Sequence, residues 1–174
     1  VDDRSLRGAA EGFEVSGSAL ASDDRLAAAS SELALLAPVP LGESLLRTMV
    51  TEAQVGKLVR RGWLQPASGG DSQRAFTLHR VPASVLRLKI VEPAAAFARA
   101  FEGLTGAVEA TADGPDRLAL HLHVLMSHLG RMQVVAGPEL VSAARRVTQV
   151  GAGLAAREHR GLRYLAAKAA HAFG

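Results

Sequence analysis

Residues 41–66 read LGESLLRTMVTEAQVGKLVRRGWLQP, and this stretch decides the fold that the sequence predicts. Its apolar residues recur every three or four positions in two short groups, which is the spacing of two amphipathic helices. The two groups are Leu45, Leu46 and Met49, then Val55, Leu58 and Val59. Thr51 can cap the start of the second helix, and Gly62 stands where a left-handed residue commonly ends one. We therefore expect a helix-turn-helix.

Two strands are expected directly after these helices. The first begins at 63–66, and 74–78 alternates polar and apolar residues as a half-buried strand does. The stretch 67–73 between them is mostly polar and contains two adjacent glycines. Helix, turn, helix, strand, loop, strand is the plan of a winged helix with a small two-stranded wing. Trp63 can stack on a nucleobase, but its place at the first strand favours a position in the core.

Several short motifs lie in register across residues 41–90. They are Leu41-Gly42-Glu43, Val50-Thr51, Gly62-Trp63-Leu64-Gln65-Pro66 and Arg74-Ala75-Phe76, followed by a helix with Val81, Val85 and Leu88 on one face. This pattern resembles the N-terminal DNA-binding region of MerR-type transcriptional regulators. The resemblance implies a winged helix that binds double-stranded DNA. Where that family carries an arginine and aromatic residues in its recognition helix, this chain has Gly56, Lys57 and Leu58.

Basic side chains are concentrated in the same region. Residues 41–90 hold eight basic and three acidic side chains, whereas residues 1–40 hold three basic and seven acidic ones. Basic side chains neutralise the phosphates of DNA or RNA. The candidate nucleic-acid-binding residues are Arg47, Gln54, Lys57, Arg60, Arg61 and Arg74. Gln54, Lys57 and Arg61 are the ones expected to reach base edges. In a second interpretation, Arg60 and Arg61 are solvated cations stabilised at the C-terminal end of a helix.

The sequence divides into three regions, and the predicted fold class is mainly α. Residues 1–40 are expected to form an irregular arm and one helix that ends before Pro38. Residues 41–90 form the MerR-like winged helix, and residues 91–174 form a helical region rich in alanine and leucine. The chain has 33 alanines against one Trp, one Tyr and five Phe, a composition that favours closely packed helices.

The C-terminal region predicts several helices. One begins after Glu92 and ends near Gly103 and Gly106, a second begins at the turn 113–116, a third opens at Gly137, and a last one follows Gly161. The second helix carries a heptad seam of Leu118, Leu122, Leu125, Leu129 and Met132. A seam of this kind is typical of helix–helix association, so we expect it to form a dimer or partner interface.

No pattern in the sequence indicates catalysis, a metal or a cofactor. The chain has no cysteine, which excludes disulfides and thiolate metal sites. His121, His123 and His128 lack the i, i+4 spacing of a helical metal site, so we expect them on a polar face or at a subunit contact. No apolar run approaches the roughly 20 residues that cross a bilayer, and the first residues lack the apolar segment of a secretory signal. No membrane span is expected.

Two functions remain for this sequence. The first is a DNA-binding transcriptional regulator, dimeric and located in a bacterial cytoplasm. The second is a non-enzymatic helical subunit of a larger protein or ribonucleoprotein complex, which would place a processed chain in an organellar matrix. An enzyme is the least expected class, because no set of side chains meets the requirements of a catalytic site.

Overall fold

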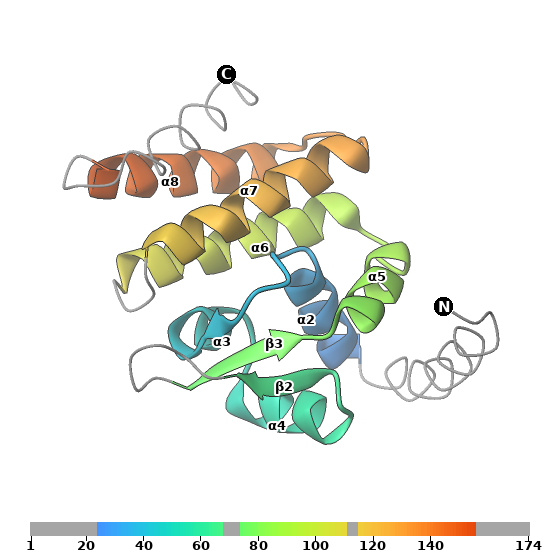
Figure 1. The fold of residues 1–174 in the computed structure, drawn as a ribbon. Helices are drawn as coiled ribbons and strands as arrows, with labels where there is room; N and C mark the ends of the chain where they lie inside the picture. The colour runs from blue at the N-terminus through green and yellow to red at the C-terminus, as the bar shows by residue number, and fades with distance from the viewer. Residues whose placement is uncertain (1–23, 68–73, 111–114, 156–174) are drawn as a thin grey trace.

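Seven helices and one small sheet make up the described part of the chain in a computed structural model (Figure 1). The structure describes residues 24–67, 74–110 and 115–155. The helices are α2 (Asp24–Ala34), α3 (Glu43–Met49), α4 (Glu52–Arg60), α5 (Arg80–Leu88), α6 (Pro93–Glu109), α7 (Pro115–Arg131) and α8 (Pro138–Ala155). The protein is therefore mainly helical, as expected. The N-terminal arm before Asp24 and the helix expected after Gly161 lie outside the described residues.

The sheet has three antiparallel strands in the order β1-β3-β2. The strands are β1 (Leu41–Gly42), β2 (Leu64–Ala67) and β3 (Ala75–Leu78). β2 and β3 lie where the sequence predicts two strands, and they pair with Leu64 opposite Leu78. β1 pairs with the other edge of β3, with Leu41 opposite Phe76. The third strand was not among the expectations, because a two-residue strand has no periodicity of its own and exists only through its pairing.

Hydrogen bonds close α4 at both ends. At its start, the Thr51 N–H donates to Oε1 of Gln54 over 2.8 Å and the Gln54 N–H donates to Oγ1 of Thr51 over 3.3 Å, which is a capping box. At its end, Gly62 has φ 69° and the Trp63 N–H donates to the Leu58 carbonyl over 3.0 Å, as in a Schellman motif. The predicted cap at Thr51 and the left-handed end at Gly62 are both confirmed.

α6 is the central helix of the fold. It packs against α8, α3, α7 and α2, and its Phe97 and Phe101 are fully buried. Figure 1 shows α6, α7 and α8 stacked on one side of the molecule, with α2, α5 and the sheet on the other. One continuous cluster of buried side chains extends from Leu26 of α2 to Val147 of α8. Trp63 belongs to this cluster, so its predicted core position is confirmed.

The heptad seam of α7 faces the inside of the chain. Leu118, Leu122 and Leu125 are buried in the core, while Leu129 and Met132 are partly buried and pack against it. A side chain that is buried within one chain cannot also meet a second chain. For Leu118, Leu122 and Leu125 this corrects the expected dimer interface: the spacing identified an apolar helix face, and the rest of the same chain covers that part of it. For the partly buried Leu129 and Met132, the interface stays a prediction.

α6 continues through Gly103 and Gly106 to Glu109, so its predicted end near these two glycines was too early. Both glycines lie where α3 approaches α6 closely. A Cβ on Gly103 would come within 2.5 Å of Met49 Cγ, and one on Gly106 within 3.0 Å of Thr48 Cγ2. The Thr48 hydroxyl also donates to the Gly103 carbonyl over 2.9 Å. These glycines therefore allow close helix packing, although glycine normally weakens a helix.

Replacing Gly103 with alanine is expected to lower the free energy of unfolding by about 1–2 kcal/mol, since α3 or Met49 has to move. Gly130 of α7 is the matched control, because a Cβ there has no neighbour within 4 Å. Gly130→Ala should leave stability unchanged or raise it by up to about 1 kcal/mol, because alanine favours the helix. Urea unfolding followed by circular dichroism measures both. Equal effects of the two substitutions would contradict the close approach.

Candidate nucleic-acid interface

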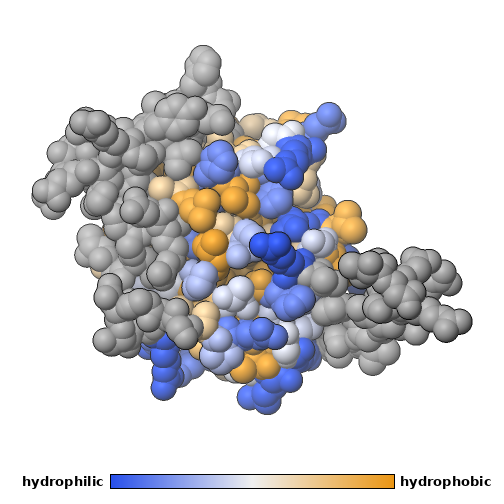
Figure 2. Space-filling model, viewed as in Figure 1, coloured by the Kyte–Doolittle hydropathy of each residue, from blue (hydrophilic) through white to orange (hydrophobic). Residues whose placement is uncertain are grey.

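α4 presents one face to solvent. Ala53, Gly56, Lys57 and Arg60 lie along it at the spacing of successive helical turns. Lys57 and Arg60 are exposed, whereas Leu58 is fully buried beneath the helix. Hydrophilic side chains dominate the lower edge of the molecule in Figure 2, which is where Figure 1 places α4. Both charged side chains on this face of α4, Lys57 and Arg60, are basic.

Two of the expected base-reading residues do not lie on this face. The Gln54 amide oxygen completes the cap at Thr51, and its Nε2 donates to the Arg25 carbonyl of α2 over 3.3 Å. Arg61 is the half-buried C-cap of α4, with its N–H donating to the Lys57 carbonyl over 3.1 Å. Gln54 therefore has a structural role, and Lys57 is the exposed member of the expected set.

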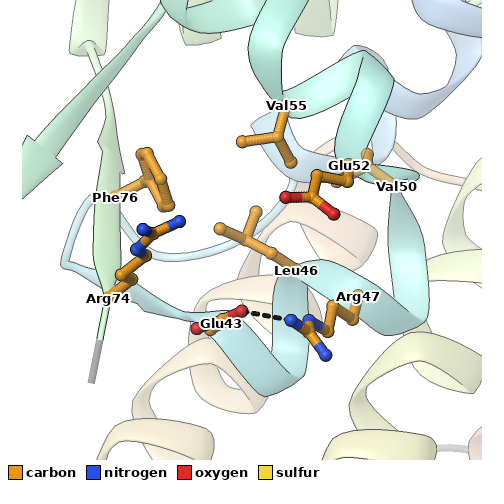
Figure 3. Close-up of a pocket in the computed structure, with 8 residues that line it drawn as sticks. All are labelled: Glu43, Leu46, Arg47, Val50, Glu52, Val55, Arg74 and Phe76. Carbon is orange, nitrogen blue, oxygen red and sulfur yellow. Dashed lines mark hydrogen bonds and ion pairs between the residues drawn. The ribbon is translucent and has the colours of Figure 1, made fainter.

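Arg47 and Arg74 both line a pocket of about 70 Å³ beside α4 (Figure 3). Its apolar lining comes from Leu46, Val50, Val55 and Phe76, and its charged lining from Glu43, Arg47, Glu52 and Arg74. Figure 3 shows Arg74 reaching from the start of β3 toward the pocket, whereas Arg47 turns toward Glu43 on its own helix. The Arg47 guanidinium forms an ion pair with the Glu43 carboxylate.

The structure therefore divides the predicted cations into two groups. Lys57 and Arg60 lie on the outer face of α4, and Arg47 and Arg74 lie at the pocket between α3, α4 and β3. The pocket also holds two carboxylates, Glu43 and Glu52, which repel an anion. The outer face of α4 has the more favourable potential for a polyanion, and the Arg74 cation adds to it from the neighbouring strand.

Three basic side chains influence one another electrostatically between α5 and α7, a grouping that the sequence did not predict. Arg87 donates to the Ala34 carbonyl over 2.6 Å, at the C-terminal end of α2, where a helix favours positive charge. Burial lowers the pKa of His128, and the charges of Arg87 and Arg131 lower it further. Burial also lowers the pKa of Arg87, with a smaller contribution from Arg131. No local motif signals this group, because Arg87 of α5 is distant in sequence from His128 and Arg131 of α7.

The lowered pKa of His128 gives folding a pH dependence with a definite sign. The unfolded chain binds a proton at His128 more readily than the folded chain, so stability is complete above about pH 6.5 and falls as the pH drops below it. We expect the urea midpoint to decrease between pH 7 and pH 5, and to decrease less in His128→Gln. Arg131→Gln should also reduce the dependence, since one repelling charge is removed.

The buried carboxyl of Glu32 contributes with the opposite sign to the same measurement. Burial raises its pKa, and its hydrogen bond and charge interaction with Arg99 oppose that rise. This background is common to the wild type and to both variants. The difference between their pH profiles therefore isolates His128, and identical profiles would contradict its role.

The three histidines of α7 do not form a metal site. His121 is fully buried and its Nδ1 accepts the Ala37 N–H over 3.2 Å, whereas His123 is exposed. This corrects the expectation that His121 lies on a polar face or at a subunit contact. Across the described ranges, no group of three or more His, Asp or Glu side chains can hold a metal ion. No helix within these ranges combines the length and the apolar character needed to cross a membrane.

Comparisons of the chain with protein-family models, with curated proteins and with solved structures find no match.

Proposed function

We propose that this protein is a DNA-binding transcriptional regulator in which α3, α4 and the β2–β3 hairpin form a winged helix-turn-helix. The order of elements supports the proposal, because helix α2, strand β1, helices α3 and α4 and two hairpin strands follow one another along the chain. The strand order β1-β3-β2 supports it too, since the first strand closes the hairpin on the side away from β2. α4 then takes the place of the recognition helix.

The observation that carries the proposal is the exposed face of α4. Its charged side chains, Lys57 and Arg60, are basic, and Thr51 and Gly62 close the helix at its two ends. A short ordered helix with basic side chains on its outer face is suited to the major groove, which admits an α-helix. Arg60 contacts phosphate in this proposal, and Lys57 reaches either phosphate or a base edge. Arg74 contacts the backbone from the wing.

A dimer remains part of the proposal, because helix-turn-helix proteins usually bind two half-sites related by a two-fold axis. The buried part of the α7 seam does not supply the contact. Leu88, Val91 and Val135 are the large apolar side chains with the greatest exposure in the described part, at 88%, 91% and 86%. They are the first residues to examine if the chain self-associates.

The test is fluorescence anisotropy of the full chain with a random-sequence DNA duplex at several salt concentrations. Lys57→Gln/Arg60→Gln should weaken binding by about tenfold to hundredfold at ~50 mM salt and reduce the log–log salt slope by about 2. The matched control is Arg145→Gln/Arg146→Gln, which changes the net charge equally at two exposed positions of α8. The control should change affinity by about twofold at most.

Absence of binding at low salt, or equal losses in the two double variants, would reject α4 as the recognition helix. The exposed Leu88, Val91 and Val135 would then favour the second function, a helical subunit of a larger protein or ribonucleoprotein complex. Sedimentation of the chain with single-stranded RNA separates the ribonucleoprotein case from a purely protein assembly.

A further inference from the structure

The pocket beside α4 holds one cation and one anion that are not paired with each other. Of its four charged side chains, Arg47 and Glu43 form an ion pair. Arg74 and Glu52 remain, and within the described residues neither of them makes an ion pair or a side-chain hydrogen bond. Both charges are therefore available to a ligand that enters the pocket.

These two side chains lie on opposite sides of the pocket. Figure 3 shows Arg74 reaching in from the residue before β3 and Glu52 from the first turn of α4, with Leu46 and Val55 between them. Both charged side chains are exposed, whereas Leu46 and Val50 are buried. The pocket thus has charges of opposite sign at its rim and an apolar floor.

This lining selects the chemical class of a ligand. A simple anion is attracted by Arg74 but repelled by Glu52, and for a simple cation the two effects are reversed. A zwitterion interacts favourably with both, because a guanidinium binds a carboxylate through paired N–H donors and a carboxylate accepts hydrogen bonds from an ammonium group. An α-amino acid carries both groups on one carbon, so both can stay at the rim while its side chain enters the apolar floor.

The volume of the pocket sets the size of that side chain. The pocket encloses about 70 Å³. Because a cavity of ~150 Å³ accepts benzene, the smaller space has room for about three or four carbon atoms. The side chains of valine and leucine have this size. Glycine would leave the floor empty, and the ring system of tryptophan is too large to enter.

We propose that this pocket binds a small aliphatic α-amino acid, with its carboxylate on Arg74, its ammonium group on Glu52 and its side chain against Leu46 and Val55. The binding itself does not depend on the proposed function, whereas its effect on DNA rests on that function. Arg74 contacts the DNA backbone there, so a bound amino acid competes with a phosphate for the same guanidinium. Each ligand therefore weakens the binding of the other.

Titration of the full chain with L-valine at ~50 mM salt, followed by NMR, tests the site directly. The methyl signals of Leu46 and Val55 should shift with a dissociation constant on the order of 1 mM, and those of Leu140 on α8 should not shift. Three matched ligands each lack one group: isovalerate lacks the ammonium group, isobutylamine the carboxylate, and glycine the side chain. Each should bind about tenfold more weakly than valine or worse.

Two substitutions assign the charged contacts. Arg74→Gln should weaken valine binding by about tenfold without weakening isobutylamine binding, because only valine carries a carboxylate. Glu52→Gln should weaken valine binding to a similar extent without weakening isovalerate binding. The matched controls Arg80→Gln and Glu109→Gln remove the same charges at exposed positions outside the pocket, so they should change valine affinity by about twofold at most.

DNA affinity gives the second measurement. Saturating L-valine should lower the affinity for random duplex DNA by about threefold to tenfold at ~50 mM salt, which is the share of one phosphate contact. The wild type should lose this response in Arg74→Gln, whose DNA affinity is already reduced. Isovalerate at the same concentration controls for the added solute and should have a smaller effect than valine.

The outcomes separate the two proposals. Pocket methyl signals that do not shift at ~20 mM valine, or equal affinities for valine, isovalerate and isobutylamine, would overturn the amino-acid site whether or not DNA binds. Equal affinity for γ-aminobutyrate, whose charges lie at the two ends of a straight chain, would overturn the placement of both charges at the rim. If valine binds as described but no DNA binding is found, the site is supported and the proposed function fails.

Discussion

Replacing Phe101 with alanine should lower the free energy of unfolding by about 3–5 kcal/mol. Phe101 is fully buried near the middle of α6, the helix that packs against α2, α3, α7 and α8. Removing its ring leaves a cavity that cannot collapse easily, because the neighbouring elements are held by one another. Small domains have only about 5–15 kcal/mol of stability in total, so this single change should bring the protein close to unfolding at room temperature.

The matched control is Phe76→Ala. Phe76 is the same residue type, but it is half-buried at the pocket beside α4 rather than enclosed in the core. Its replacement should cost about 1–2 kcal/mol, because solvent can enter the space that the ring leaves. Urea unfolding followed by circular dichroism measures both variants. Phe101→Leu retains most of the volume and provides a folded alternative if the alanine variant does not fold. Equal losses for Phe101→Ala and Phe76→Ala would show that α6 is not the centre of the core.

Replacing Trp63 with alanine is expected to cost about 3–5 kcal/mol as well, and to release α4 from the hairpin. Trp63 is 3% exposed. Its N–H closes the C-terminal end of α4 on the Leu58 carbonyl, and its own carbonyl accepts the His79 N–H over 3.1 Å. These are backbone hydrogen bonds that alanine can also make, whereas the indole ring belongs to the core cluster that includes Leu58 of α4 and Leu78 of β3, and its loss removes that packing. Hydrogen exchange of the Arg61, Gly62 and Trp63 amides should accelerate more than that of the α8 amides.

Trp63→Phe provides the control for this prediction. Phenylalanine keeps an aromatic ring in the core, so the loss should be about 1–2 kcal/mol. DNA affinity should be unchanged in Trp63→Phe, since a buried ring cannot stack on a base. A loss of DNA affinity in a fully folded Trp63→Phe variant would contradict the core assignment and support stacking.

Features that depend on neighbouring residues were predictable from the sequence. The cap at Thr51 and the left-handed Gly62 depend on hydrogen bonds within a few residues of each, so a short motif is sufficient to predict them. The structural role of Gln54 in the cap could have been predicted from the same local sequence. Thr51-Glu52-Ala53-Gln54 has the spacing of a capping box, which already favours a structural use of that amide over base reading.

Features that depend on distant residues were not predictable in this way. β1 exists because Leu41 pairs with Phe76, and α6 passes through Gly103 because Met49 and Thr48 of α3 lie against it. The spacing of Leu118, Leu122 and Leu125 reports an apolar helix face but not what covers that face. The exposure of Lys57 also depends on what packs against α4, whereas the ion pair of Arg47 with Glu43 is an i, i+4 contact that the sequence could have predicted.

The two closed ends of α4 have a consequence for the thermodynamics of any ligand that binds there. A nine-residue helix is too short to be stable alone in water, so its order comes from its caps and from the buried Leu58. That order is established when the protein folds, before a ligand arrives. Binding at α4 therefore loses no entropy to coil-to-helix ordering of this segment. Calorimetry should then show a change in heat capacity that reflects only the surfaces brought into contact, without the larger decrease that accompanies folding of a segment upon binding.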